Sequence, residues 1–187
     1  MQVEIVIAGF GGQGILFAGQ VLAHAAMEAG KNVTWFPSYG PEMRGGTANC
    51  TVIISDEEIG SPLVRHPRAA IVMNRPSLDK YEPLVQPGGL LVVNASMAGR
   101  SVERTDVEVV ALPASEIAEA LGDRRLANMV MVGALLARLP VLSLEQVEGA
   151  LQERMPVRHR HLMERNILAL REGARAAQIA FVPAVSR

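Results

Sequence analysis

Short apolar runs separated by turns dominate the first half of the chain and predict the strands of a sheet. The first run is broken only by Glu4 and ends at Gly9, which is typical of a strand that is buried on both faces. The third run is rich in β-branched residues, which favour strands. We therefore expect at least five strands. They are predicted at Val3–Ala8, Asn32–Phe36, Thr47–Ser55, Ala69–Met73 and Gly89–Asn94.

Apolar residues at helical spacing fill the interval between the first two strands and most of the last third. From Gly12 to Ala29 they recur with the helical period, and Gly30 stands where a C-terminal cap is expected. Further along, Ser143 and Gln146 form the pattern of a capping box. The later helices are predicted at Pro113–Leu121, Leu126–Leu139, Ser143–Met155 and from about Arg160 onward, with Met163, Ile167, Leu170, Ala174 and Ala177 on one face.

The order of these elements predicts the fold class. The chain opens as strand, glycine-rich turn, helix and strand, which is a βαβ unit with a right-handed crossover. The connection between the second and third strands is too short for a helix, so we expect antiparallel pairs. The expected fold is α/β, a three-layer, Rossmann-like mixed sheet flanked by helices, with a helical C-terminal third. No linker or repeat divides residues 1–187, so we expect a single domain.

Composition and charge restrict the kinds of partner. The chain has 187 residues, 49% of them hydrophobic, and its 18 basic and 19 acidic residues leave a net charge of −1. This balance lacks the basic surface that nucleic-acid binding needs. The N-terminus has no basic region before the first strand, and no apolar run approaches the membrane-spanning length of about 18 residues. We expect a cytoplasmic protein that contacts neither membrane nor nucleic acid.

Thiols and potential metal ligands are few. Cys50 is the only cysteine, so the chain forms no internal disulfide and holds no iron–sulfur cluster with its own thiolates. Its place within a predicted strand favours a small core residue over a reactive thiol. His159 and His161 lie two apart, on different faces of any helix, and His24 and His66 are single. The sequence therefore predicts no metal site.

A glycine-rich turn follows the first strand. Gly9, Gly11 and Gly14 match the pattern G-x-G-x-x-G, in which glycines permit a tight turn and the following helix offers unpaired N–H groups to a phosphate. The alternative is that the glycines only let the helix pack closely on the sheet. An NAD site needs an acidic residue at the end of the second strand. Residues 36–38 are Phe-Pro-Ser instead, so a dinucleotide site is the weaker interpretation.

A second loop, residues 38–46, follows the second strand. It is expected at the same edge of the sheet as the first turn, and ligands of open α/β sheets bind at that edge. Gly45 and Gly46 give the backbone of this loop conformational freedom. Arg44 can hold a phosphate or carboxylate through two parallel hydrogen bonds. The alternative is an internal contact between Glu42 and Arg44 in a solvated loop.

These two segments carry a resemblance to a known family. Residues 9–14 (Gly-Phe-Gly-Gly-Gln-Gly) and residues 38–46 (Ser-Tyr-Gly-Pro-Glu-Met-Arg-Gly-Gly) together resemble the gamma subunits of 2-oxoacid:ferredoxin oxidoreductases. Residues 127–135 (Ala-Asn-Met-Val-Met-Val-Gly-Ala-Leu) are similar to the buried late helix of that family, and residues 166–173 to its closing segment. The likeness extends from residue 1 to about residue 177.

The resemblance implies a subunit of an assembly that decarboxylates a 2-oxoacid on thiamine diphosphate, passes electrons through iron–sulfur clusters to ferredoxin, and releases acyl-coenzyme A. The thiamine diphosphate and the clusters would belong to partner alpha, beta and ferredoxin-like delta subunits. The family's thiamine motif, Gly-Asp-Gly with a paired Asn, is not found, because Gly122-Asp123 continues into two arginines. The resemblance assigns no catalytic residue to this chain.

The chain alone is expected to bind no cofactor; within the complex, its glycine-rich edge either helps to hold coenzyme A or packs on the thiamine-binding chains. Two other functions fit the sequence, namely a free-standing NAD- or flavin-dependent oxidoreductase and a purely structural adaptor. Pyruvate, 2-oxoglutarate and branched-chain oxoacids all stay open, and the short, separate chain favours 2-oxoglutarate. A surface meant for partners also predicts self-association of the isolated chain. The candidate binding residues are Gly9, Gly11, Gly12, Gln13, Gly14, Ser38, Tyr39, Arg44, Gly45 and Gly46.

Overall fold

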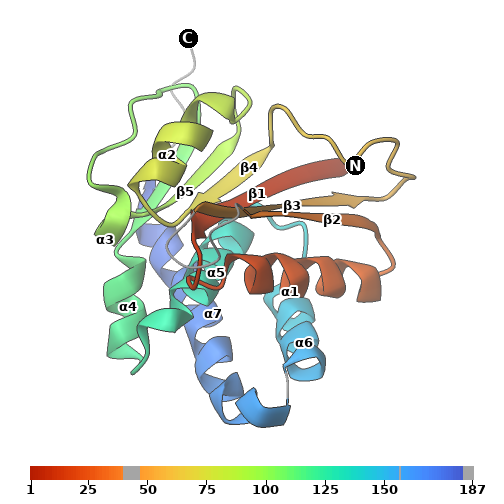
Figure 1. Cartoon of the computed structure of the whole chain (residues 1–187), viewed down its shortest axis with the longest axis vertical. Helices are drawn as coiled ribbons and strands as arrows, with labels where there is room; N and C mark the ends of the chain where they lie inside the picture. The colour runs from red at the N-terminus through yellow and green to blue at the C-terminus, as the bar shows by residue number, and fades with distance from the viewer. Residues whose placement is uncertain (40–46, 156, 183–187) are drawn as a thin grey trace.

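Seven strands form one sheet in the computed structural model, which describes residues 1–39, 47–155 and 157–182 (Figure 1). Their order across the sheet is β2-β3-β1-β4-β5-β6-β7. The five predicted strands are all present, and two short strands are added at one side of the sheet. The strands are β1 (Gln2–Phe10), β2 (Asn32–Tyr39), β3 (Thr47–Ser55), β4 (Ala69–Val72), β5 (Leu90–Asn94), β6 (Glu108–Leu112) and β7 (Phe181–Val182).

β1 lies between β3 and β4. It pairs antiparallel with β3, from Gln2 opposite Ser55 to Phe10 opposite Thr47, and parallel with β4. Because β3 also pairs antiparallel with β2, β1 and β2 run in the same direction with β3 between them. The predicted mixed sheet is confirmed. The βαβ opening is present but split by a strand that comes later in the sequence.

The direction of the outer strands places both ends of the described chain at one edge of the sheet. β4, β5 and β6 run parallel to β1, and β7 pairs antiparallel with β6. The chain therefore enters the sheet at Gln2 and leaves it at Val182 on the same edge. β1 ends at Phe10 on the opposite edge. Pro37 lies in the outer strand β2, where the missing N–H is tolerated.

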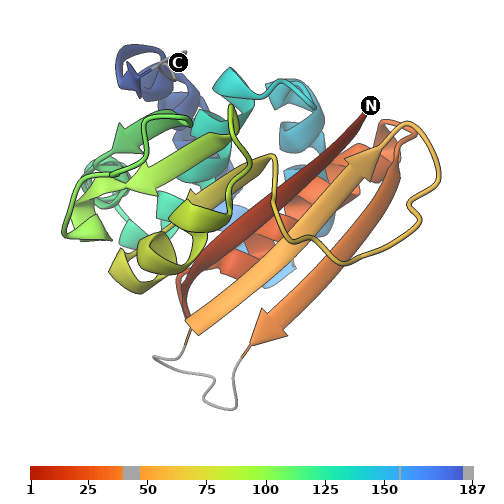
Figure 2. The ribbon, with the colours of Figure 1, turned by 90° about the horizontal axis from the view of Figure 1, so that it is seen from above.

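The helices form a layer on each face of the sheet, which confirms the three-layer fold (Figures 1 and 2). α1, α4, α5, α6 and α7 close the larger core, and α2 and α3 close the smaller core on the other face. The predicted helical C-terminal third is confirmed. The helices are α1 (Ile15–Glu28), α2 (Arg75–Tyr81), α3 (Ala95–Ala98), α4 (Ala114–Ala120), α5 (Ala127–Arg138), α6 (Leu144–Arg154) and α7 (Met163–Ile179), with 3-10 turns at Glu82–Leu84, Arg124–Leu126 and Val157–Leu162.

α5 and α7 pack backbone to backbone because each contributes a glycine to their contact. A Cβ on Gly133 of α5 would overlap the carbonyl oxygen of Leu170, and a Cβ on Gly173 of α7 would overlap the carbonyl oxygen of Val130. α5 itself is buried at every residue from 127 to 136. An apolar helix of this length could lie in the core or at a subunit contact, and burial within the single chain supports a core helix.

Local signals fix several helix boundaries as the sequence predicts. The capping box at the start of α6 is confirmed, since Ser143 Oγ accepts from the Gln146 N–H at 3.2 Å and Gln146 Oε1 accepts from the Ser143 N–H at 2.8 Å. α1 begins directly after Gly14. Within the described ranges, no helix is long and apolar enough to cross a membrane.

Candidate functional site

The glycine-rich turn joins the end of β1 to the start of α1. The Gln13 N–H donates to the carbonyl oxygen of Phe10 at 3.1 Å, which closes the turn. Gly12 and Gly14 have φ angles of +94° and +74°, a region that glycine enters without steric cost. The first N–H groups of α1 have no partner within the helix, so its N-terminus favours an anion at this edge of the sheet.

Gly9 and Gly14 serve close packing. A Cβ on Gly9 would lie 2.6 Å from Gln13 Oε1, and a Cβ on Gly14 would overlap the side-chain amide of Asn128. These contacts support the packing interpretation of the motif for both glycines. Their predicted role in binding a ligand stays a prediction, because the contacts alone do not test it.

Gln13 is held by contacts within the protein. Its Oε1 accepts from the Phe10 N–H at 2.6 Å and from Asn74 Nδ2 at 3.2 Å, and its Nε2 donates to Met97 Sδ at 3.3 Å. The carboxamide thus ties the turn to the start of α2 and to α3. Among the predicted binding residues, Gln13 has the contacts of a residue that positions the turn.

Gly12 is the exposed glycine of the turn, and two cavities meet at it. Nothing lies within 4 Å of a Cβ built on Gly12. One cavity, of about 360 Å³, extends from Gly12 past Phe17 to Asn166. The other, of about 320 Å³, extends from Gly12 to Met97. Arg125 lines both cavities. Gly11, which precedes Gly12 in the turn, is half-buried.

Arg125 brings a positive charge to these cavities that the sequence analysis missed. Its Nη2 and Nε donate to Asp123 Oδ2 at 2.6 and 3.0 Å, yet its side chain stays 75% exposed. Hydrogen bonds from Arg125 lower the pKa of the Asp123 carboxyl, and that carboxylate raises the pKa of the Arg125 guanidinium. Arg124 lines the second cavity. In the sequence, Arg124 and Arg125 are visible only as two charged residues between two predicted helices.

Asn128 anchors the start of α5 to the glycine-rich turn. Its Nδ2 donates to the carbonyl oxygen of Gly14 at 3.1 Å, and its Oδ1 accepts from the Met129 N–H at 2.8 Å. This contact spans 114 residues of sequence. It brings together residues 9–14 and 127–135, two of the segments on which the resemblance rests.

The strands that bracket the second loop end beside the turn. Phe10 lies opposite Thr47, and Tyr39 lies opposite Ala48 (Figure 2). Ser38 is exposed near this edge. The predicted convergence therefore holds for the flanks of the loop. The side chain of Tyr39 is not described, and three predicted binding residues lie outside the described residues: Arg44, Gly45 and Gly46.

Cys50 is a buried thiol, as predicted. Its Sγ donates to the carbonyl oxygen of Ile15 at 3.5 Å, and its side chain lies against Gly19 of α1. Burial raises the pKa of the Cys50 thiol to about 12. A thiol in this state is a poor nucleophile and a poor metal ligand.

A further cavity, of about 620 Å³, lies away from the turn, between α3 and β6. Its arginines are paired and, unlike Arg125, only 20% and 21% exposed. Arg100 Nη1 lies 2.6 Å from Glu82 Oε2, and Arg104 Nη2 lies 2.6 Å from Asp106 Oδ2. Glu82 also accepts from the N–H groups of residues 103 and 104, which fixes the loop beside this cavity.

A mixed sheet whose first strand leads through a glycine-rich turn into a helix defines a Rossmann-like domain with a candidate anion site at that edge. Residues 4–176 match the family described as pyruvate ferredoxin/flavodoxin oxidoreductase. The chain belongs to this family, which confirms the resemblance drawn from its glycine-rich segments.

Several relatives match this chain over different shares of their length. The 2-oxoglutarate synthase subunit KorC of Methanothermobacter marburgensis is 38% identical over 180 residues, covering 92% of this chain and 95% of KorC. The ketoisovalerate oxidoreductase subunit VorA of Methanothermobacter thermautotrophicus is 44% identical over 136 residues, or 73% of this chain, and the matched part is only 28% of VorA. The crystal structure of a keto/oxoacid ferredoxin oxidoreductase gamma subunit from Geobacter sulfurreducens superposes with a TM-score of 0.86 at 30% identity, covering 97% and 99% of the two chains.

Proposed function

We propose that this chain is the gamma subunit of a 2-oxoacid:ferredoxin oxidoreductase, a complex that converts a 2-oxoacid to acyl-coenzyme A and reduces ferredoxin. The end-to-end match with KorC carries the proposal, because it covers 92% of this chain and 95% of that subunit. The equally complete superposition on a gamma subunit supports it. Residues 1–187 then act as one gamma-type domain.

In this proposal the redox chemistry belongs to partner alpha, beta and ferredoxin-like delta subunits. The reaction needs a cofactor that stabilises a carbanion and a carrier that accepts electrons. The single cysteine of this chain is buried, and the thiamine motif is not found in its sequence. This chain therefore contributes ligand binding and assembly contacts, in a cytoplasmic complex.

Coenzyme A is the ligand that we propose for the glycine-rich edge. The N-terminus of α1 supplies N–H donors, exposed Gly12 leaves the approach clear, and Arg125 supplies charge to both adjacent cavities. From the sequence, we propose a second guanidinium from Arg44, which lies outside the described residues. The two cavities, of about 360 and 320 Å³, each reach the lower part of the range of about 300–1,000 Å³ for small-molecule sites.

Among the oxoacids we propose 2-oxoglutarate. The KorC subunits match over nearly their whole length, whereas the VorA match is confined to part of a longer subunit. The reconstituted complex should show its highest kcat/KM with 2-oxoglutarate when pyruvate and 2-ketoisovalerate are assayed beside it. A preference for 2-ketoisovalerate would overturn the assignment.

A structural adaptor is the second candidate, and it is favoured by the packing roles of Gly9, Gln13 and Gly14. In that case both loops support subunit contacts and no ligand touches this chain. Kinetics in coenzyme A separate the two candidates, since an adaptor affects assembly without affecting the Michaelis constant.

A dinucleotide-dependent dehydrogenase fits the topology poorly. In dinucleotide sites the acidic residue that binds the ribose stands on the strand beside the first one. Here β3 lies between β1 and β2, so the end of β2 lies two strand spacings, about 10 Å, from β1 instead of one. The intervening strand therefore argues against this interpretation independently of the missing acid.

The deciding experiment is steady-state kinetics of the reconstituted complex, with coenzyme A varied at saturating oxoacid. Arg44→Ala and Arg125→Ala should each raise the KM for coenzyme A by about tenfold, the loss expected for a charged hydrogen bond. Arg44→Lys should restore the KM only partly, because the lysine ammonium cannot form the two parallel hydrogen bonds of a guanidinium. Arg171→Ala is the matched control, since Arg171 pairs with Glu148 on α6. An unchanged KM together with lost co-elution of the subunits would establish the adaptor.

A further inference from the structure

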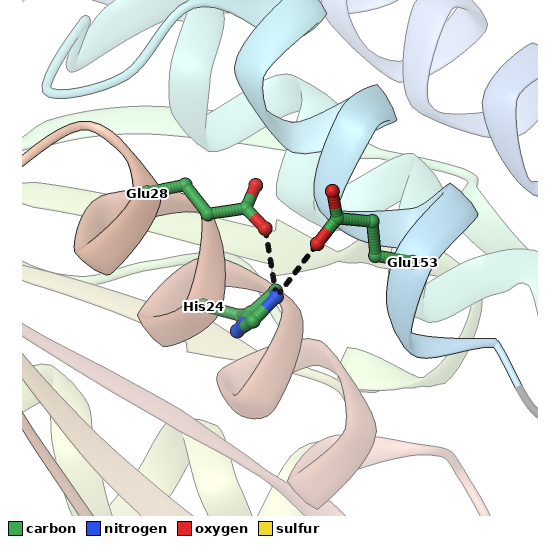
Figure 3. A group of neighbouring side chains, drawn as sticks. All are labelled: His24, Glu28 and Glu153. Atoms are coloured by element: carbon green, nitrogen blue, oxygen red, sulfur yellow. Dashed lines mark hydrogen bonds and ion pairs between the residues drawn. The ribbon is translucent and has the colours of Figure 1, made fainter.

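His24 is isolated in the sequence but not in space. Its Nε2 lies 2.8 Å from Glu28 Oε1, one turn further along α1, and 3.5 Å from Glu153 Oε2 in α6. Figure 3 shows both carboxylates directed at the same imidazole nitrogen. The Nε2 atom and one oxygen of each carboxylate all lie within 4.8 Å of one another. The pair His24 and Glu153 is separated by 129 residues, which is why no sequence pattern reveals it.

We propose that His24, Glu28 and Glu153 form a site for a divalent transition metal ion, Zn²⁺ foremost, that bridges α1 and α6. Imidazole nitrogen and carboxylate oxygen are ligands that Zn²⁺ accepts, and three protein ligands leave a fourth position for water. Bonds of about 2.0–2.2 Å set tetrahedral ligand atoms about 3.5 Å apart. The separations of 2.8 and 3.5 Å around Nε2 need only small side-chain shifts to reach this arrangement.

The scaffold presents these ligands on two packed helices. His24 and Glu28 stand four residues apart and so share one face of α1. α1 and α6 contact each other and bury apolar residues in the same core, which fixes the distance across the site. The side chains are 18%, 35% and 66% exposed in the order His24, Glu28, Glu153. The site is therefore anchored on the protein side and accessible to a metal ion and water from solvent.

Charge favours a cation in this place. Two carboxylates converge on one imidazole, and a divalent ion at their meeting point neutralises both. Hard oxygen ligands alone would suit Mg²⁺ or Ca²⁺, whereas the imidazole shifts the preference to Zn²⁺ and its neighbours among the transition metals. Bound metal would join α1 to α6 and so stabilise the folded chain.

The metal site is independent of the proposed ligand edge. It lies in the C-terminal half of α1, whereas the glycine-rich turn lies at the N-terminal end, and His24 is about 15 Å from Gly14 along the helix. Failure of one proposal therefore leaves the other intact.

The test uses the full chain without a histidine tag, stripped of metal by a chelator and titrated with Zn²⁺ in a calorimeter. One site per chain is expected. His24→Gln and Glu153→Gln should each weaken binding by at least about tenfold, because each removes a ligand directly. Glu119→Gln is the matched control, an exposed carboxylate on α4, and should leave the affinity unchanged.

Thermal unfolding gives a second measurement. At about 100 times the dissociation constant, Zn²⁺ should raise Tm by about 5 °C or more, and Glu153→Gln should abolish this rise.

The same variants define the results that would overturn the proposal. The metal-free variants should melt within a few degrees of the parent, because all the substitutions are at partly exposed positions. Absence of heat and of a Tm shift up to millimolar Zn²⁺ would show that the cluster is an ion pair only. Binding that survives in His24→Gln but is lost in His161→Gln would place the metal at the other histidine-containing segment and refute this site.

Discussion

At the residue scale, Gly12 and Gly14 occupy neighbouring left-handed positions but have different surroundings. A methyl group on Gly14 meets the Asn128 amide, whereas one on Gly12 meets nothing within 4 Å. We expect Gly14→Ala to lower the free energy of unfolding by about 3 kcal/mol, and Gly12→Ala by about 1 kcal/mol, the cost of the backbone conformation alone. Urea denaturation of the two variants measures the difference, and equal losses would contradict it.

The φ angle of Gly12 also refines a substitution that the sequence suggests. With the turn known only as a motif, Gly12→Val is expected to damage ligand binding more than folding. At φ of +94° a β-branched side chain is strongly disfavoured, so valine would also strain the turn. Gly12→Ala is the cleaner probe of ligand approach for that reason.

Burial of the Cys50 thiol makes the free energy of unfolding depend on pH in the alkaline range. Burial raises the pKa of its thiol to about 12, whereas an unfolded thiol titrates near 8.5. Above pH 8.5 the unfolded chain releases this proton and the folded chain does not, so stability present at neutral pH is lost as pH rises. We expect the parent to lose about 2 kcal/mol more than Cys50→Ala between pH 7 and pH 10 in urea unfolding. Parallel pH profiles for the two proteins would show that Cys50 is not the cause.

The geometry around the candidate site could be predicted where the signal is local and could not where it depends on distant contacts. The order of strand, glycines and helix identified the turn at residues 9–14, because a tight turn of this kind shows in adjacent residues. Arg125 was missed because its proximity to Gly12 depends on the contact between Asn128 and Gly14, which are 114 residues apart. The proposed role of Arg44 stays a prediction, because that residue lies outside the described ranges.

At the scale of elements, the contact between α5 and α7 depends on reciprocal glycines. Gly133→Ala or Gly173→Ala would drive a methyl group into the backbone of the other helix, so we expect a loss of about 3 kcal/mol or more. Gly149→Ala in α6 is the matched control, because nothing lies within 4 Å of its Cβ. That control should gain about 0.5–1 kcal/mol from better helix propensity. Thermal and urea unfolding measure both effects, and a tolerated Gly133→Ala would show that the helices can separate.

Most elements could be predicted because they carry long periodic patterns. The third strand was predicted at its observed bounds, Thr47–Ser55, and α5 within one residue at each end. β7 has two residues and α3 has four, too few to show a period. α2 carried a usable signal that was missed, since Asn74 caps the helix and proline follows at its start. The insertion of β3 between β1 and β2 is a non-local pairing that no local pattern specifies.

At the scale of the whole molecule, the proposed division of labour predicts an inactive chain. Purified alone, it should show no oxoacid oxidation with an artificial electron acceptor, because carbanion stabilisation and electron transfer need the partner subunits. Activity should appear when the partners are added. The measurement is acceptor reduction by the isolated chain and by the reconstituted complex. Turnover by the chain alone, free of thiamine diphosphate and clusters, would refute the proposal.

The face of β2 and β3 that no helix covers predicts that the isolated chain self-associates. Among the described residues, no helix covers β2 and β3 on the face that carries α2 and α3 (Figure 2). Phe36 is 53% exposed in the outer strand β2. An apolar side chain beside an open strand edge favours self-association. Sedimentation should therefore detect oligomers that Phe36→Ser reduces, and a monodisperse monomer at high concentration would contradict this.

The two ends of the described chain leave the sheet on the edge opposite the glycine-rich turn. A polypeptide can therefore be extended at either end without crossing the proposed ligand approach. VorA matches this chain over only 28% of its own length, which shows that a closely similar segment occurs inside a longer protein. The geometry of the sheet thus makes this domain suited to gene fusion, in which subunits that assemble as separate chains become consecutive parts of one reading frame.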